Sequence, residues 1–273
     1  MSRPIPLVEP WFPAAYADAV RDQVLSGFIG PGKGKLGILS ADCEPDPATI
    51  DHVLKPFLTA KGVAFADARV SCDAGTAQQQ VGAAALQLRR AGVDRVLLLA
   101  LFTTSQSFVQ VADAQSWRPK YGVADRQGLV LDATTRAFPP DAFDGARGVT
   151  YGHSGEEKAG IKYSPGVQRC SDIIKAAGLP AITNQMGTDG LAVAACDGFF
   201  LWLAAARAAP VNLTRADVIA AIPSIGEYAL SAFALRARYG PGKYQGGDAY
   251  AVVEWRKSCS CFVQIKRPMP ARF

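Results

Sequence analysis

From residue 35 to residue 151, strand-type and helix-type segments alternate regularly along the chain. Residues 95–101 form the clearest strand-type segment, and they are apolar on both faces, as expected of a central parallel strand with helices on each side. This βαβαβαβ order predicts an α/β fold with a doubly wound parallel sheet. The expected strands are 35–40, 63–70, 95–101, 120–123 and 148–151, and the expected helices between them are 46–61, 76–90 and 105–116.

The alternation stops after residue 152. Helix-type segments cover 167–177 and 190–209, and Thr214-Arg215-Ala216-Asp217 resembles the capping-box start of a short helix. We therefore divide the chain into an α/β lobe over residues 11–152 and a second part over 153–273, made of hinge crossovers and an incomplete lobe of helices and short strands. The last strand-type segments, which we expect to need a sheet that this chain does not contain, are 230–235, 249–255 and 261–265.

Composition excludes several classes of protein. Apolar residues make up 49% and charged residues 19% of the sequence, which is typical of a folded globular chain. The net charge of +5 is spread without a Lys/Arg run, so no nucleic-acid partner is expected. The most hydrophobic stretch, residues 191–206, contains Asp197 and is too short to span a bilayer. The first residues have no apolar signal-peptide core, which taken literally predicts a cytoplasmic chain.

The six cysteines point instead to an oxidising compartment. Cys43 follows one expected strand and Cys72 ends the next, which in a parallel sheet is compatible with a bond between them. An even number of cysteines with such neighbours favours disulfides, and the alternative is six ordinary buried thiols. Zinc is not favoured, because the sequence has no paired CxxC motifs with a nearby histidine. The other cysteines are Cys170 and Cys196, which flank a crossover, and Cys259 and Cys261, on a terminal strand.

Two motifs suggest enzymatic chemistry but stand in the wrong context. The glycine-rich residues 30–35 precede a strand instead of joining a strand to a helix, so no helix N-terminus faces a phosphate there. Residues 152–155 (GHSG) lack both the GxSxG spacing and the strand–turn–helix of a hydrolase. His52 and His153 are the only two histidines, which leaves little for general-base chemistry. We expect neither an enzyme nor a cofactor.

The best candidates for ligand contact follow the carboxyl ends of two neighbouring strands, where open α/β sheets bind their ligands. Phe102, Thr103 and Thr104 follow the central strand and lead into a helix, whose free N–H groups favour an anionic group. Asp125 and Arg126 follow the next strand, and a carboxylate at this place suits a ligand ammonium group.

These positions also have a purely structural interpretation. Thr104 or Ser105 would then only cap its helix, and Asp125 would pair with Arg126. The sequence leaves both interpretations open.

Four stretches, taken in their order along the chain, resemble one known family. They are residues 34–39 (GKLGIL), 93–97 (VDRVL) followed by 102–104 (FTT), 195–198 (ACDG), and 250–255 (YAVVEW) before 259–262 (CSCF). In this order they are similar to the type I periplasmic binding proteins, the branched-chain amino acid (leucine/isoleucine/valine) substrate-binding family of ABC transporters. The similarity spans most of the chain from about Trp11.

The resemblance implies a fold, a ligand class and a partner. In that family two α/β lobes close over a small ligand, commonly an amino acid or amide, and the complex docks on a membrane permease outside the cytoplasm. Phe102 and Asp125 match the family's aromatic and acidic ligand contacts of the second lobe. Phe102 replaces the usual tyrosine, so the ligand is expected to differ from leucine.

One departure from the family is large. Most of the family's first lobe would precede Trp11, and ten residues do so here. We expect a truncation or a misplaced start site to account for this difference. We also expect the Phe199 and Trp202 face of the 190–209 helix to be exposed, because it would pack on the missing sheet.

Four functions are therefore compared. The preferred one is a solute-binding component of an ABC-type importer, with an amino acid-like ligand and no catalysis. The alternatives are a ligand-sensing domain of a receptor or regulator, an enzyme on a Rossmann-like sheet, and a truncated remnant that binds nothing. The missing phosphate fingerprint and the scarcity of histidines argue against the enzyme.

Overall fold

The computed structural model describes residues 27–43, 46–125, 128–183, 189–210, 213–243 and 246–270 of the chain. These residues form two compact units. The sheet unit contains the described residues from 27 to 150 together with 252–266, and the helical unit contains those from 151 to 251 together with 267–270. The expected boundary at residue 152 stays a prediction, and residues 252–266, which it placed in the second part, lie in the sheet unit.

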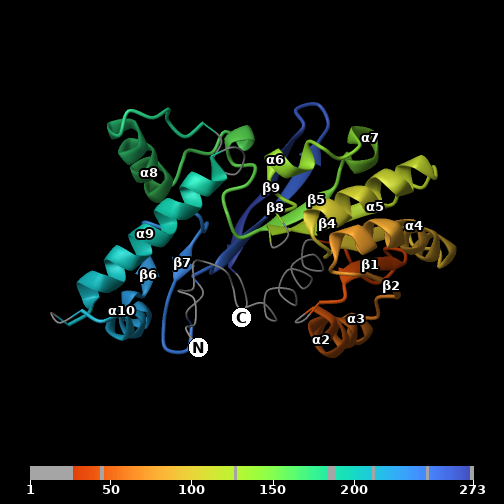
Figure 1. Cartoon of the computed structure of the whole chain (residues 1–273), viewed down its shortest axis with the longest axis horizontal. Coiled ribbons are helices and arrows are strands. Elements are labelled where there is room, and N and C mark those ends of the chain that lie inside the picture. Colours follow the sequence, from red (N-terminus) through yellow and green to blue (C-terminus); the bar gives the residue numbers. More distant parts are fainter. Residues whose placement is uncertain are drawn as a thin grey trace. The chain divides into compact units, whose positions relative to one another are not determined.

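Seven strands form the sheet of the sheet unit (Figure 1), in the spatial order β2-β1-β3-β4-β5-β8-β9. They are β1 (Leu36–Ala41), β2 (Phe65–Val70), β3 (Arg95–Leu98), β4 (Lys120–Ala124), β5 (Arg147–Thr150), β8 (Ala249–Arg256) and β9 (Cys261–Pro270). The first five pair in parallel, which confirms the predicted doubly wound sheet. The other two extend it beyond β5, where the Trp255 N–H donates to the Ala146 carbonyl over 2.9 Å.

Helices cover both faces of this sheet (Figure 1). They are α2 (Asp46–Thr49), a π-helical turn (Ile50–Leu54), α3 (Lys55–Ala60), α4 (Ala74–Arg90), α5 (Phe102–Ala114), α6 (Asp132–Thr135) and α7 (Pro140–Phe143). Val96 and Leu98 of β3 are buried in a core with Phe108 of α5, whereas Leu97 is buried in a second core with Leu54. Successive strand residues point to opposite faces, so β3 is covered on both sides as its sequence predicted.

The helical unit packs around one long helix. Its elements are a 3₁₀ turn (Glu157–Ala159), α8 (Pro165–Ala176), α9 (Gly190–Ala208), α10 (Arg215–Ala221), a second 3₁₀ turn (Ile222–Ile225) and the antiparallel strands β6 (Glu227–Tyr228) and β7 (Ala237–Arg238). Val193 and Phe200 of α9 contribute to one small core, and Leu201 and Ala205 contribute to another. The predicted capping box of α10 is present, with Thr214 and Asp217 bonded reciprocally.

Within the described residues, α9 is the one helix long and apolar enough to cross a membrane, with a mean hydropathy of 1.5. The expectation that this stretch is too short is therefore wrong, because the helix extends beyond residues 191–206 at both ends. A carboxylate near its middle ties it to a loop of the helical unit. Asp197 is buried and accepts hydrogen bonds from Ser231 Oγ at 2.6 Å, Ala232 N at 2.6 Å and Phe233 N at 3.1 Å. These bonds are typical of a helix packed inside a folded unit.

Two expectations about strands are wrong. Residues 230–235 form turns instead of a strand. The N–H groups of Ala232 and Phe233, which would pair with a neighbouring strand, donate to Asp197 instead. An isolated bridge joins Ala234 to Gly152. The last strands do not need a sheet from outside this chain, because β8 and β9 join the sheet next to β5. Gly148 of β5 has no side chain, and a Cβ there would lie 2.6 Å from Val253 Cγ2 of β8.

Candidate functional site

The candidate site lies at the carboxyl edge of the sheet unit. β3 and β4 are parallel neighbours, with Leu97 aligned to Gly122. Phe102 follows β3 as the first residue of α5, and Asp125 follows β4 directly. The structure therefore brings both predicted ligand contacts to the same edge, on adjacent strands.

The N-terminus of α5 has no side-chain cap. Its N-cap residue is Leu101, whose apolar side chain accepts no hydrogen bond. Leu101 and Phe102 are 48% and 41% exposed, and Thr103 is exposed as well. Uncapped N–H groups at the first turn of a helix are ready to bind an anionic group.

Thr104 and Ser105 lie inside the helix instead of at its start. Thr104 is buried, and the buried Ser105 Oγ donates to the Ala100 carbonyl over 3.0 Å. The alternative prediction, in which Thr104 or Ser105 caps the helix, is therefore wrong, because the N-cap is Leu101. The helix begins three residues earlier than predicted, because the Ser105 N–H already bonds to the Leu101 carbonyl at 2.8 Å.

Asp125 is half-buried, and its Oδ1 atom is fully buried. Its backbone carbonyl accepts the Gly128 N–H over 2.8 Å, which begins the loop after β4. Arg126 lies outside the described residues, so the predicted contacts of its side chain stay a prediction.

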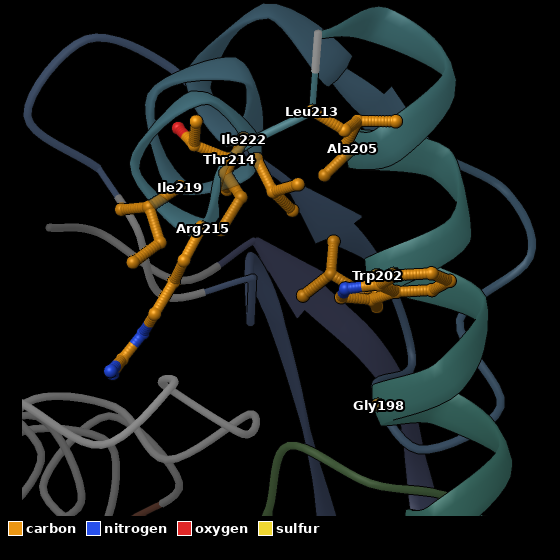
Figure 2. A pocket seen from close by; sticks show the side chains of 10 residues that line it. Gly198, Trp202, Ala205, Leu213, Thr214, Arg215, Ile219 and Ile222 are labelled. Carbon is orange, nitrogen blue, oxygen red and sulfur yellow. The ribbon is translucent and has the colours of Figure 1, made fainter.

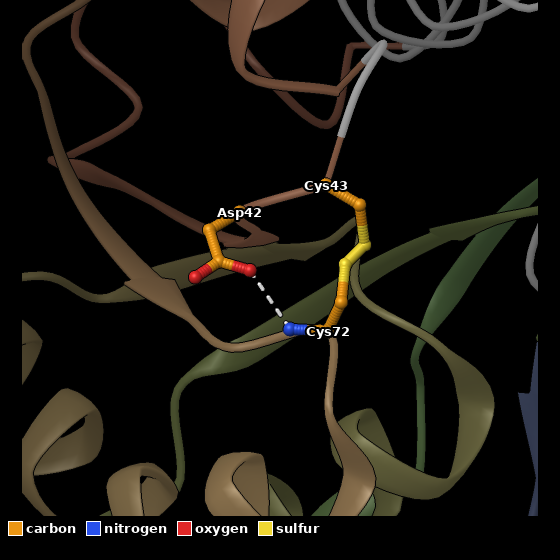
Figure 3. Close-up of side chains that lie close together, drawn as sticks. All are labelled: Asp42, Cys43 and Cys72. Atoms are coloured by element: carbon orange, nitrogen blue, oxygen red, sulfur yellow. Dashed lines mark hydrogen bonds between the residues drawn. A yellow bond between two sulfur atoms is a disulfide. The ribbon is translucent and has the colours of Figure 1, made fainter.

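The same edge carries a disulfide that links the ends of β1 and β2. Cys43 and Cys72 are bonded, with their Cα atoms 5.7 Å apart, and Asp42 Oδ1 accepts the Cys72 N–H over 2.8 Å (Figure 3). Asp42 and both sulfurs lie within 4.8 Å of one another, a spacing that suits a metal ion. Because the sulfurs are bonded to each other, neither is a thiolate, and the group acts as a structural link. Asp42 was not predicted from the sequence, although it lies directly after β1, at the carboxyl end of a strand.

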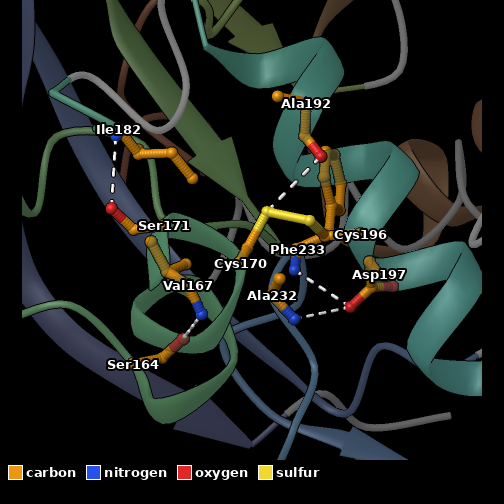
Figure 4. Close-up of a disulfide and its surroundings, with 10 residues drawn as sticks. All are labelled: Ser164, Val167, Cys170, Ser171, Ile182, Ala192, Cys196, Asp197, Ala232 and Phe233. Atoms are coloured by element: carbon orange, nitrogen blue, oxygen red, sulfur yellow. Dashed lines mark hydrogen bonds between the residues drawn. A yellow bond between two sulfur atoms is a disulfide. The ribbon is translucent and has the colours of Figure 1, made fainter. Parts of the chain in front are cut away.

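The other four cysteines are also paired, which confirms the predicted disulfides and overturns the alternative of free thiols. Cys170 of α8 is bonded to Cys196 of α9, with a Cα separation of 5.8 Å (Figure 4). Cys259 is bonded to Cys261 in the turn between β8 and β9, with a Cα separation of 5.1 Å.

The helical unit contains a separate apolar pocket of about 390 Å³ between α9 and α10 (Figure 2). Trp202 and Leu201 line it from α9, and Val218 and Ile219 line it from α10. On the same helix, Phe199 and Trp202 are 58% and 46% exposed, as the sequence predicted. The pocket was not predicted from the sequence. It forms where α9 packs against α10, and the hydrophobic pattern predicts each helix separately but not their contact.

The GHSG motif is not a hydrolase site in this structure. His153, Ser154 and Glu156 are buried, and His153 Nδ1 lies 2.7 Å from Glu156 Oε2. The motif is followed by a short 3₁₀ turn, Glu157–Ala159, instead of the helix that a nucleophile elbow requires.

No protein-family model and no curated protein matches this sequence. Solved structures do match its fold. A branched-chain amino acid ABC transporter from Thermus thermophilus with bound valine matches 93% of this chain, with 15% identity and a TM-score of 0.70. A fatty acid ABC transporter substrate-binding protein from Thermomonospora curvata matches 95% of it, with 15% identity and a TM-score of 0.64. An extracellular ligand-binding receptor from Rhodopseudomonas palustris HaA2 matches 91%, with 16% identity and a TM-score of 0.67.

The chain has the fold of the type I periplasmic binding proteins, as the resemblance implied. It covers 64%, 63% and 66% of these three structures, so it spans about two thirds of their length. Two of these neighbours are named for substrate or ligand binding, and the third has bound valine.

Proposed function

We propose that this chain is the solute-binding component of an ABC-type importer and binds an amino acid or a similar small polar solute without catalysis. The observation that carries the proposal is the placement of Phe102, the uncapped start of α5, and Asp125 on adjacent strands at one edge of the sheet.

Each of these groups suits one part of an amino acid. The Asp125 carboxylate attracts an ammonium group, and the free N–H groups at the start of α5 attract a carboxylate. The exposed ring of Phe102 offers an apolar surface for a side chain. Phe102 has no hydroxyl, so it contributes packing and no hydrogen bond.

The structural neighbours leave the ligand class open, because one has bound valine and another is a fatty acid binder by name. Asp125 supports the amino acid, since a carboxylate repels the carboxylate of a fatty acid and attracts an ammonium group.

A membrane permease is the proposed protein partner, and the cell envelope or the extracellular space is the proposed location. Three disulfides that pair all six cysteines support an oxidising compartment.

The test is thermal melting of the purified chain against amino acids, amides and small carboxylates. We expect one class of amino acid-like solutes to raise the Tm, since a ligand that binds only the native state stabilises it. Asp125→Ala should abolish that shift. Asp113→Asn is the matched control, because Asp113 lies at the opposite end of α5, paired with Arg118 at 2.6 Å. A melt that no solute changes, or a shift that Asp125→Ala retains, would refute the proposal.

A ligand-sensing domain is the second candidate, supported by the fold shared with an extracellular ligand-binding receptor. Both functions predict the same ligand binding, so the partner distinguishes them. Loss of uptake of the identified solute in cells without this chain supports the importer component. Unchanged uptake with a lost response to the solute supports the sensor.

A further inference from the structure

The disulfide between Cys259 and Cys261 differs from the other two in its place and its exposure. It closes over one residue, Ser260, in the turn between β8 and β9. Cys259 is exposed, whereas Cys261 is 1% exposed. The two other disulfides join separate secondary-structure elements, with sequence separations of 29 and 26, and neither contains an exposed cysteine.

The turn that holds this disulfide is anchored on both sides. The Lys257 N–H donates to Asp144 Oδ1 over 2.9 Å, and the Phe262 N–H donates to Asp132 Oδ1 over 2.8 Å. Phe262 is fully buried in the core of the sheet unit. The backbone on either side of the two cysteines is therefore fixed by contacts that do not involve sulfur, and a broken disulfide leaves the two thiols close together.

The intervening residue also has an unusual backbone. Ser260 has a φ of +48°, in the left-handed region that residues other than glycine rarely occupy. Ser260 and Ser116 are the two non-glycine residues with positive φ among the described residues. This conformation belongs to the tight turn, in which the Ser260 N–H also bonds to the Lys257 carbonyl at 3.3 Å, and it sets Ser260 apart from an ordinary strand residue.

We propose that Cys259 and Cys261 form a thiol–disulfide exchange site for low-molecular-weight thiols. The thiolate of a small thiol attacks the exposed Cys259 sulfur, a bond forms between these two sulfurs, and the Cys259–Cys261 bond breaks. Its electron pair remains on Cys261, which takes up a proton. A second thiolate then attacks the thiol's own sulfur in this mixed disulfide and releases Cys259 as a thiol. In sum, two thiols are oxidised to one disulfide, and the protein disulfide is reduced to two thiols.

The difference in exposure assigns separate roles to the two cysteines. We assign attack by an external thiol to Cys259, which is an exposed residue, and the resolving role to Cys261, which is buried. When an external disulfide modifies reduced Cys259, Cys261 attacks the Cys259 sulfur, expels the small thiol and restores the protein disulfide. A small thiol needs no docking groove to reach an exposed cysteine, and for this reason we propose low-molecular-weight thiols as the reactant.

The test follows the three disulfides of the whole chain during incubation with reduced glutathione. Samples are quenched with acid, alkylated and digested with trypsin, which leaves Cys259 and Cys261 on one peptide, residues 258–266. We expect this disulfide to open about 10-fold faster than either of the others, because exposure controls access to the attacked sulfur. Opening at the same rate as Cys170–Cys196, or more slowly, would overturn the proposal.

Two variants test the assigned roles. With oxidised glutathione, the Cys261→Ser variant should accumulate a glutathione adduct on Cys259, because no resolving thiol is left. The Cys259→Ser variant should form an adduct on the buried Cys261 about 10-fold more slowly. Equal adduct formation in the two variants would contradict the roles. Circular dichroism and intact Cys43–Cys72 and Cys170–Cys196 disulfides report correct folding, and the comparison of rates in the unmodified chain needs no variant.

Discussion

The sheet unit and the helical unit bury their apolar residues in different ways. In the sheet unit, β3 contributes Val96 to a core on one face and Leu97 to a core on the other, and helices close both. In the helical unit, α9 contributes to two small cores and still exposes Phe199 and Trp202. Apolar contacts on both faces of the sheet stabilise the sheet unit. We expect the helical unit to depend more on its buried polar anchor, Asp197, which accepts three hydrogen bonds.

The largest effect is expected from removing the main polar anchor of the helical unit, Asp197. Asp197→Ala leaves the hydroxyl of Ser231 and two backbone N–H groups buried without their acceptor. We expect a loss of about 4 kcal/mol in the unfolding free energy, because each unpaired buried donor costs about 1–3 kcal/mol. Urea unfolding measures the loss, and hydrogen exchange should show opening of residues 231–234 with the sheet unit still protected.

The control for that experiment is Asp172→Asn. Asp172 is exposed on α8 and accepts a hydrogen bond from Gln168, so its replacement should change the unfolding free energy by less than about 0.5 kcal/mol. If Asp197→Ala costs no more than Asp172→Asn, the helical unit does not depend on this anchor.

A smaller effect is expected from overpacking the sheet unit. A Cβ at Gly122 would lie 2.6 Å from Phe28 Cε1 and 3.3 Å from Leu97 Cδ1, and both side chains are buried. We expect Gly122→Ala to cost about 2 kcal/mol, because a well-packed core must shift to admit the methyl group. Chemical denaturation measures this cost.

Gly82→Ala is the matched control within the same unit. Gly82 lies inside α4, and a methyl group added there would meet nothing within 4 Å, so alanine should stabilise the helix by about 0.5–1 kcal/mol. Equal effects of the two substitutions would show that the space around Gly122 is not restricted.

The smallest effect is expected at low pH, where one helix cap in each unit should weaken. The backbone N–H of Thr76 lowers the pKa of Asp73 in the sheet unit, and the side chain of Thr214 lowers the pKa of Asp217 in the helical unit. A lowered folded pKa means that the stabilisation is present above the ordinary value of 3.8 and is lost as the pH falls below it. Hydrogen exchange of the Thr76 and Asp217 amides should therefore speed up, relative to the intrinsic rate, between about pH 5 and pH 2.

Asparagine at position 73 is the control for the first cap, because an amide oxygen also accepts the bond but does not titrate in this range. Retention of the acid effect in Asp73→Asn would show that another group causes it.

The sequence predicted the sheet unit well because its signals are local. Apolar segments such as residues 95–101 lie between capped helices, and parallel pairing follows from that order. The pairing of β8 and β9 next to β5 was missed, because the contact between Trp255 and Ala146 joins residues far apart in the chain. The strand expected over 230–235 failed for a similar reason, since its N–H groups bond to Asp197 on another element.

The candidate site was partly predictable. The rule that ligands bind at the carboxyl ends of parallel strands selected Phe102 and Asp125, and the structure places both at that edge. Their contact with a ligand stays a prediction. The start of α5 was misjudged, because Thr104 and Ser105 have the side chains of typical caps, whereas the N-cap is Leu101.

The carboxylate of Asp197, which anchors residues 231–233, also affects the tendency of the α9 segment to enter a membrane before the chain has folded. If the chain is exported to the location proposed above, a nascent segment with a mean hydropathy of 1.5 is at risk of entering the lipid from the translocation channel. Asp197 lies near the middle of α9, and an aspartate at the centre of a bilayer costs about 3 kcal/mol. In an exported chain the same side chain would therefore oppose retention in the membrane, and in the folded unit it anchors the loop of residues 231–233.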